Sequence, residues 1–279
     1  MKLRYLGTAA AEGWPAVFCR CPHCDRARAA GGKNIRTRSQ AMINSDMLID
    51  FPPDANMHML TNNIDYSAIK FLLITHPHSD HFAPLDLAFR DDAYYAHNLT
   101  EEKLILAGPK RVIDAYENYF GRFSDERRCK YITPMVLENY VTYEFGDYKV
   151  TPIRANHTRD ENNACCYIIE EGGKTLLYLH DTGLLYDDVW EYLEKSKIKA
   201  DFVSLDCTFV TLPGSGGHLG LDTCKITADM MREKGIADEN TVFCVNHFSH
   251  NGGAIYDELV PIAAKDGFLT SYDGMEVEI

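Results

Sequence analysis

Short runs of apolar and β-branched residues recur along the chain and alternate with stretches that have helical spacing. Runs of this length, bounded by turn-forming residues, predict buried strands. The predicted strands are Leu3–Leu6, Met47–Asp50, Phe71–Thr75, Lys149–Arg154, Ala164–Ile169, Thr175–Leu179, Phe202–Leu205 and Thr241–Asn246. Strands interleaved with helices indicate an α/β protein whose sheets are covered by helices.

Four stretches predict helices: Pro109–Phe120, Asp187–Lys195, Asp222–Lys234 and Ala254–Ala263. Asp187 and Asp222 are candidate N-caps, and Gly235 stands where a helix C-terminus favours glycine. The glycine-rich segments 213–217 and 251–253 are expected to be flexible connections. Because no proline- or serine-rich linker divides the chain, we expect one domain over residues 1–279.

Composition and charge narrow the class of protein. Of the 279 residues, 46% are hydrophobic and 25% are charged, which is typical of a globular protein. We expect a cytoplasmic protein without a membrane partner, because no run of 18 apolar residues occurs and the first residues lack a secretory signal. The nine cysteines, an odd number, favour metal ligation over a disulfide framework. The net charge of −13 argues against long nucleic acids, whose phosphates require a basic surface.

The densest chemical motif is His76-Pro-His78-Ser-Asp80-His81, which directly follows the predicted strand Phe71–Thr75. Imidazole and carboxylate groups are ligands for Zn, Mn or Fe, so three histidines and an aspartate in six positions predict a metal site. The alternative is a solvated polar loop. Further ligand types stand just after later strands, in the order His157, Asp181 and His247. Short loops at strand ends can present such side chains from a rigid base.

Asp50, the His76–His81 motif, His157, Asp181 and His247 together resemble, in order, the motifs of the metallo-β-lactamase-fold hydrolases. This resemblance implies a four-layer αββα sandwich with a dinuclear metal site along one edge. It implies that one metal is held by His76, His78 and His157, and the other by Asp80, His81 and His247. By the same resemblance, Asp181 would bridge the two metals and Asp50 would orient the ligand loop from behind.

A second cluster, Cys19-Arg-Cys21-Pro-His-Cys24, offers three thiolates close to the N-terminus. Three thiolates need a fourth donor for a closed tetrahedral zinc site, and His250, three residues beyond His247, is a candidate. A redox pair or plain buried thiols are the alternatives. The cluster and the His247-x-x-His250 pair resemble the branch that hydrolyses phosphoribosyl cyclic phosphate in phosphonate breakdown. That resemblance implies a structural zinc on Cys19, Cys21, Cys24 and His250.

His218 lies in a glycine-rich segment ahead of a predicted helix and resembles the catalytic histidine of related phosphodiesterases. We expect it to protonate the leaving group, with Asp80 and Asp181 holding the metals that activate the attacking water. A helix-capping or solvent-exposed histidine is the alternative.

The sequence therefore predicts a dinuclear metal-dependent hydrolase, a phosphodiesterase for a small, cyclic or open, phosphate diester. Alternatives are a thioester or lactone hydrolase on the same metals, an RNA nuclease, and a non-catalytic metal-binding module. We expect a small-molecule substrate and no nucleic-acid partner, and we leave open whether the protein is a monomer or a homodimer.

Overall fold

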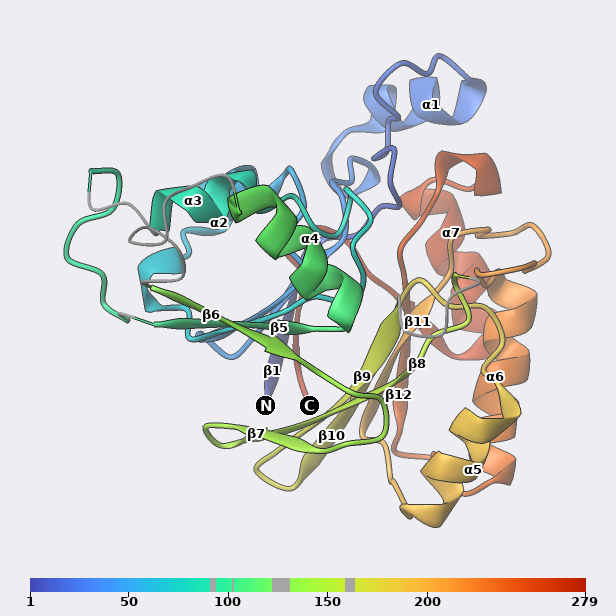
Figure 1. Cartoon of the computed structure of the whole chain (residues 1–279). Helices are drawn as coiled ribbons and strands as arrows, with labels where there is room; N and C mark the ends of the chain where they lie inside the picture. Colours follow the sequence, from blue (N-terminus) through green and yellow to red (C-terminus); the bar gives the residue numbers. More distant parts are fainter. Residues whose placement is uncertain (91–93, 102, 122–130, 159–163) are drawn as a thin grey trace.

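The computed structural model describes residues 1–90, 94–101, 103–121, 131–158 and 164–279. Two seven-stranded mixed sheets face each other across a core, and helices cover the outer face of each sheet (Figure 1). This is the expected four-layer sandwich. Arg159, which the sequence places beside His157, lies outside the described residues. Within those residues, no helix is long and apolar enough to cross a bilayer.

The first sheet has the strand order β14-β1-β2-β3-β4-β5-β6. Its strands are β1 (Lys2–Gly7), β2 (Gln40–Ile43), β3 (Met47–Ile49), β4 (Phe71–Leu73), β5 (Leu104–Gly108), β6 (Ile132–Val136) and β14 (Glu276–Glu278). Strands β3 to β6 run parallel, and β1 pairs antiparallel with β14, which brings the two chain ends together (Figure 1).

The second sheet has the order β13-β12-β11-β10-β9-β8-β7. Its strands are β7 (Tyr143–Phe145), β8 (Tyr148–Arg154), β9 (Cys165–Glu171), β10 (Lys174–Leu179), β11 (Phe202–Asp206), β12 (Val242–Asn246) and β13 (Phe268–Thr270). Strands β10 to β13 are parallel, whereas β9 is antiparallel to both β8 and β10. The carboxyl ends of β8, β10, β11 and β12 therefore meet at one edge of this sheet.

The helices are α1 (Pro22–Ala30), α2 (Ala55–Asn62), α3 (Leu87–Arg90), α4 (Lys110–Phe120), α5 (Asp187–Lys195), α6 (Leu221–Glu233) and α7 (Tyr256–Ala263). Helices α2, α3 and α4 lie on the first sheet, and α5, α6 and α7 lie on the second (Figure 1). Amphipathic helices cover the sheets because each has one apolar face to bury. In α4, the residues buried on that face recur at helical spacing: Val112, Ile113, Tyr116 and Phe120.

All eight predicted strands and all four predicted helices are present, but two details were wrong. Asp187 and Asp222 are not N-caps: helix α5 already includes Asp187 and helix α6 begins at Leu221, so their caps are Tyr186 and Gly220. Asp222 Oδ1 instead accepts a hydrogen bond from the Gly214 amide. Gly235 follows α6 at φ 66°, a left-handed conformation that glycine adopts without steric cost.

The glycine-rich segment before α6 is also not the free connection that its composition suggested. Ser215 and His218 exchange backbone hydrogen bonds across a tight turn. A Cβ on Gly217 would lie 2.9 Å from the Cα of His157. This glycine is therefore needed for close packing of the turn against the segment that carries His157.

Candidate metal centre

The side chains predicted as metal ligands gather where the carboxyl ends of strands from both sheets meet. Residues 76–81 follow β4, His157 follows β8, Asp181 follows β10 and His247 follows β12. Their donor atoms form two groups: His76, His78 and His157, and then Asp80, His81, Asp181 and His247. Chain segments more than 150 residues apart in the sequence thus supply one site.

In the first group, three imidazole nitrogens point at one another. His78 Nδ1 lies 3.0 Å from His76 Nε2 and 3.2 Å from His157 Nε2. Burial lowers the pKa of His76 well below its usual value, so its ring is neutral. Ring nitrogens that converge in this way are joined either by a shared proton or by a cation, and a transition metal suits imidazole ligands.

In the second group, the ring nitrogens of His81 and His247 surround one buried carboxylate oxygen, Asp181 Oδ2. Among the described residues, Asp181 Oδ2 is buried without a well-oriented hydrogen-bond donor, although His81 Nε2 is in close contact and His247 Nε2 is 3.3 Å away. Asp80 Oδ2 lies 3.3 Å from the same His81 nitrogen. His76 Nε2, from the first group, is 3.6 Å from Asp181 Oδ2, so this oxygen lies between the two groups. The donor atoms of the two groups therefore adjoin each other around Asp181 Oδ2 and form a set that could hold metal.

Electrostatics also indicate that this place requires positive charge. Burial disfavours the charged form of Asp181, but His247 and His81 outweigh burial and hold its pKa well below 3.8. Burial likewise opposes protonation of His81, yet Asp181 and Asp50 raise its pKa well above 6.5. The carboxylates thus favour a protonated, positively charged ring at a fully buried position. A bound metal ion would supply that positive charge in place of the proton.

Four of the five candidate histidine ligands also form a hydrogen bond through the ring nitrogen that points away from the cluster. His81 Nδ1 donates to Asp50 Oδ2 at 2.7 Å, and His76 Nδ1 lies 3.0 Å from Thr75 Oγ1. On the other sheet, the partners are the Gly217 carbonyl for His157 and Thr208 Oγ1 for His247. Hydrogen bonds of this kind fix the ring orientation and leave the inward nitrogen as a lone pair for metal.

Asp50 lies directly behind the candidate ligands His81 and His76. Besides His81, its carboxylate accepts hydrogen bonds from the Thr75 amide at 2.8 Å and the Thr75 hydroxyl at 2.9 Å. Through Thr75 it also steers His76, so one buried carboxylate orients a ligand in each group. Asp50, Asp181 and His247 all have left-handed φ angles, of 66°, 48° and 63°. Such conformations are costly and concentrate at functional sites.

His218 lies beside both groups, with its ring centroid 4.9 Å from that of His157 and 5.9 Å from that of His247. Its side chain is one-quarter exposed, whereas Nδ1 donates inward to Asp206 Oδ2 at 3.0 Å. Burial opposes protonation of His218, but Asp206 and then Asp181 raise its pKa to about 9. The ring can therefore carry a proton at neutral pH, with Nε2 as the remaining donor.

Sequence reasoning missed Asp206, although it follows an apolar strand as the predicted ligands do. It is fully buried and accepts hydrogen bonds from His218, from the Leu219 amide and from the backbone and hydroxyl of Thr208. Because Thr208 Oγ1 also contacts His247 Nδ1 at 2.8 Å, Asp206 supports both His218 and a candidate ligand.

The cysteine cluster forms a separate site at the start of α1, next to the segment after β12. His250 Nδ1 lies 3.4 Å from Cys21 Sγ and 3.8 Å from Cys19 Sγ, and Cys24 completes the group. His23 is not among its members; it contacts Arg26 instead. Burial raises the pKa of Cys21, but the Cys24 amide and His250 outweigh it and lower the value to about 6. A thiolate with three further donors suits tetrahedral zinc.

Two polar residues close in sequence to the candidate ligands take structural roles. The Arg154 guanidinium lies over the Tyr186 ring and 3.7 Å from the Asp188 carboxylate. His180, although adjacent to Asp181, is buried with Nε2 2.6 Å from Ser204 Oγ. The eight cysteines in the described part of the chain are free thiols.

A family model described as "Beta-lactamase superfamily domain" matches residues 47–236. The chain is 29% identical to Coenzyme PQQ synthesis protein B of Methylobacterium sp. (strain 4-46) over 216 residues, 68% of each protein. It is 31% identical to the protein of that name from Methylobacterium radiotolerans over 126 residues, 41% of this chain and 42% of the other.

Solved structures share the fold at low sequence identity. Zn²⁺-bound PqqB from Methylobacterium extorquens superposes with a TM-score of 0.76 at 19% identity, covering all of both chains. A diphosphatase from the PhnP family gives 0.76 at 20% identity, covering 100% of this chain and 96% of the other. The short form of human tRNase Z gives 0.65 at 16% identity, covering 100% and 99%.

Proposed function

Because the chain belongs to the beta-lactamase superfamily, a family of metal-dependent hydrolases, we propose that it is a dinuclear phosphodiesterase for a small phosphate diester, cyclic or open. The observation that carries this proposal is the position of His218. It is a partly exposed imidazole that hydrogen-bonds a buried carboxylate and lies beside two groups of converging histidine and aspartate side chains. A phosphodiester needs both electrophilic help at its oxygens and a proton for its leaving group.

Each residue would have a separate role in binding metal or in moving a proton. His76, His78 and His157 would hold one divalent ion, and Asp80, His81 and His247 the other, with Asp181 shared. Two such ions, when bound, neutralise phosphate charge and lower the pKa of an attacking water. His218 Nε2 would give its proton to the leaving oxygen, while Asp206 holds Nδ1 and keeps the ring in place. Asp50 would keep His81 and His76 turned inward.

The likeness to a diphosphatase of the PhnP family supports phosphorus as the reacting centre. The net charge of −13 disfavours a large RNA as substrate, despite the fold shared with tRNase Z. A thioester or lactone remains the rival on the same metals, because an activated water also attacks carbonyl carbon.

A panel of substrates tests the proposal. Protein purified without added metal is first analysed for Zn, Mn and Fe, and then assayed on an aryl phosphodiester, a five-membered cyclic phosphate, a thioester, a lactone and a tRNA precursor. We expect turnover of the phosphodiesters and its loss in an Asp181→Ala variant. Preferential turnover of the thioester, the lactone or the tRNA precursor would refute the diester assignment.

The relatives favour a second candidate, a step in coenzyme synthesis. The 29% identity with Coenzyme PQQ synthesis protein B, over two thirds of both proteins, is the specific observation. The test is to express this chain in a Methylobacterium strain that lacks its own protein B and to measure PQQ. Restoration by the unaltered chain but not by Asp181→Ala would support this role; no restoration would count against it.

A further inference from the structure

The backbone and side chain of Asp50 are both constrained. Its side chain is fully buried, its φ is 66°, and its carboxylate holds His81 directly and His76 through Thr75. The direction of that carboxylate depends on how the backbone turns after β3. Whatever fixes the Asp50 backbone therefore fixes ligands in both groups of the metal centre.

Gln40, the first residue of β2, holds that backbone. It is fully buried, and its side-chain Nε2 donates a hydrogen bond to the Asp50 carbonyl oxygen at 2.9 Å. The Asp50 amide donates in turn to the Leu73 carbonyl at 2.7 Å on the neighbouring strand. Both polar backbone groups of Asp50 are thus anchored, one by the sheet and one by a side chain.

Two further residues orient the Gln40 amide. His58 Nδ1 lies 2.6 Å from Gln40 Oε1, and the Tyr66 hydroxyl donates to the same oxygen at 3.1 Å. Burial lowers the pKa of His58 to about 4, so the ring is neutral and Nδ1 carries its proton toward Oε1. With two donors at Oε1, the amide nitrogen must face Asp50. Thr37 Oγ1, 2.6 Å from Nε2, holds the far side of the His58 ring.

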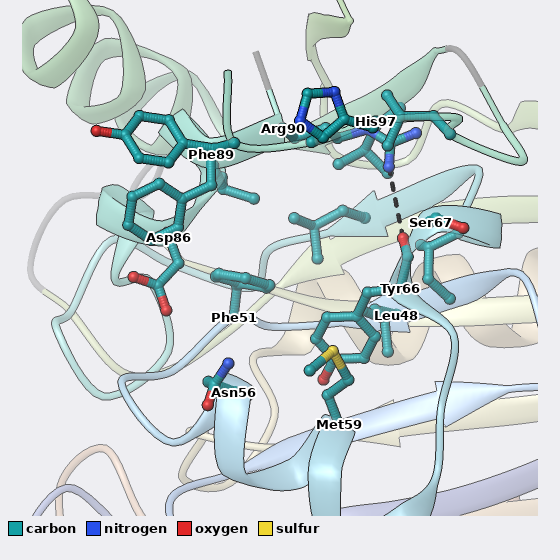
Figure 2. Close-up of a pocket in the computed structure, with 17 residues that line it drawn as sticks. Leu48, Phe51, Asn56, Met59, Tyr66, Ser67, Asp86, Phe89, Arg90 and His97 are labelled. Carbon is teal, nitrogen blue, oxygen red and sulfur yellow. Dashed lines mark hydrogen bonds between the residues drawn. The ribbon is translucent and has the colours of Figure 1, made fainter. Parts of the chain in front are cut away.

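Gln40 and His58 are buried, and none of the three residues is among the candidate metal ligands. Figure 2 shows the Tyr66 ring near Met59 and Leu48, in the wall of an apolar cavity of about 500 Å³. The lining of that cavity includes none of the candidate metal ligands.

We propose that Gln40, oriented by His58 and Tyr66, is a positioning residue of the metal centre that sets ligand geometry in both groups through Asp50. The inference rests on the proposed metal centre, but not on the identity of the substrate. Partners behind metal ligands typically contribute about 10–100-fold to metal affinity.

The test compares two buried amides. Gln40→Met keeps the side-chain volume and removes the bond to Asp50. Asn34→Leu is the matched control, because Asn34 is also a buried amide but bonds Asp257 and the Gly31 carbonyl. Co²⁺ affinity is measured by chelator competition together with the Co²⁺ absorption spectrum. We expect Gln40→Met to lose about 10-fold or more in affinity with a changed spectrum, and Asn34→Leu to match the unaltered protein. Unchanged binding in Gln40→Met, or equal losses in both variants, would overturn the proposal.

A second variant keeps the test decisive if Gln40→Met does not fold. Tyr66→Phe removes one of the two donors at Gln40 Oε1 and keeps the aromatic ring in the cavity wall, so we expect weakened Co²⁺ binding in a folded protein. Normal affinity in folded Tyr66→Phe would also overturn the inference. Because the readout is metal binding, failure of every phosphodiester assay would refute the proposed function and leave this test intact.

Discussion

His218 Nδ1 and Asp206 Oδ2 lie 3.0 Å apart, with the carboxylate fully buried and the imidazole one-quarter exposed. A hydrogen bond to an ionised buried partner is short, strong and directional. It leaves Nε2 as the only ring nitrogen of His218 that can meet a substrate. The site therefore contains a candidate proton donor in addition to the candidate metal ligands.

Replacing His218 with Ala should reduce turnover of a phosphodiester with a poor leaving group by about 10²–10⁴-fold. The reason is that an alkoxide needs a proton, whereas a reactive aryl leaving group departs without one. Elemental analysis should find the same metal content as in the unaltered protein. His97→Ala, at an exposed histidine, is the control. Equal effects on good and poor leaving groups would contradict the role of His218 as an acid.

Asp206→Asn should move the alkaline limb of the pH–rate profile to lower pH. Asp206 is the main group that raises the pKa of His218 to about 9, against the opposing effect of burial. The protonated acid is present below that pKa and is lost as the pH rises through it. Without the carboxylate charge the pKa falls, by about 1–3 units for a charge at this distance. A profile measured from pH 6 to 10 that keeps its alkaline limb would rule out this coupling.

Cys21→Ser should remove about one equivalent of zinc and destabilise the fold. A structural zinc contributes folding free energy, so we expect a loss of a few kcal/mol, or roughly 10 °C in Tm. Zinc content and thermal unfolding are measured on the same sample. Loss of activity with unchanged zinc content would contradict a structural role for the cluster.

His58 should make the metal-free protein sensitive to mild acid. Its folded pKa is about 4, below the 6.5 of an exposed histidine, so the unfolded chain takes up a proton that the folded chain excludes. The resulting destabilisation is absent above pH 6.5 and complete below pH 4, where it reaches about 3 kcal/mol. His58→Gln lacks this penalty.

Urea unfolding of both proteins at pH 7 and pH 4 measures the effect. The free energy of unfolding of the unaltered protein relative to His58→Gln should fall by about 3 kcal/mol between the two pH values. Taking the difference between the two proteins removes the contribution of every other group that titrates identically in both. A constant difference would show that His58 is protonated in the folded state.

The sequence by itself determined the strands and named the candidate ligands, for one physical reason. A buried strand must be apolar, so a histidine or aspartate directly after it marks a loop at a rigid edge, as with Asp181 after β10 and His247 after β12. The same signal was available for Asp206 at the carboxyl end of β11, but one aspartate at a strand end is commonly a turn residue.

Only the tertiary structure decided which side chains share a cluster and what stands behind them. Gln40 carries no local sign of a role, because strand pairing and not sequence spacing brings it to Asp50, and His58 contacts Gln40 and not Asp50. The glycine-rich turn looked free because the atoms that confine Gly217 belong to His157, sixty residues away. Hydrogen bonds and packing depend on distances in space, which the folded sheets set.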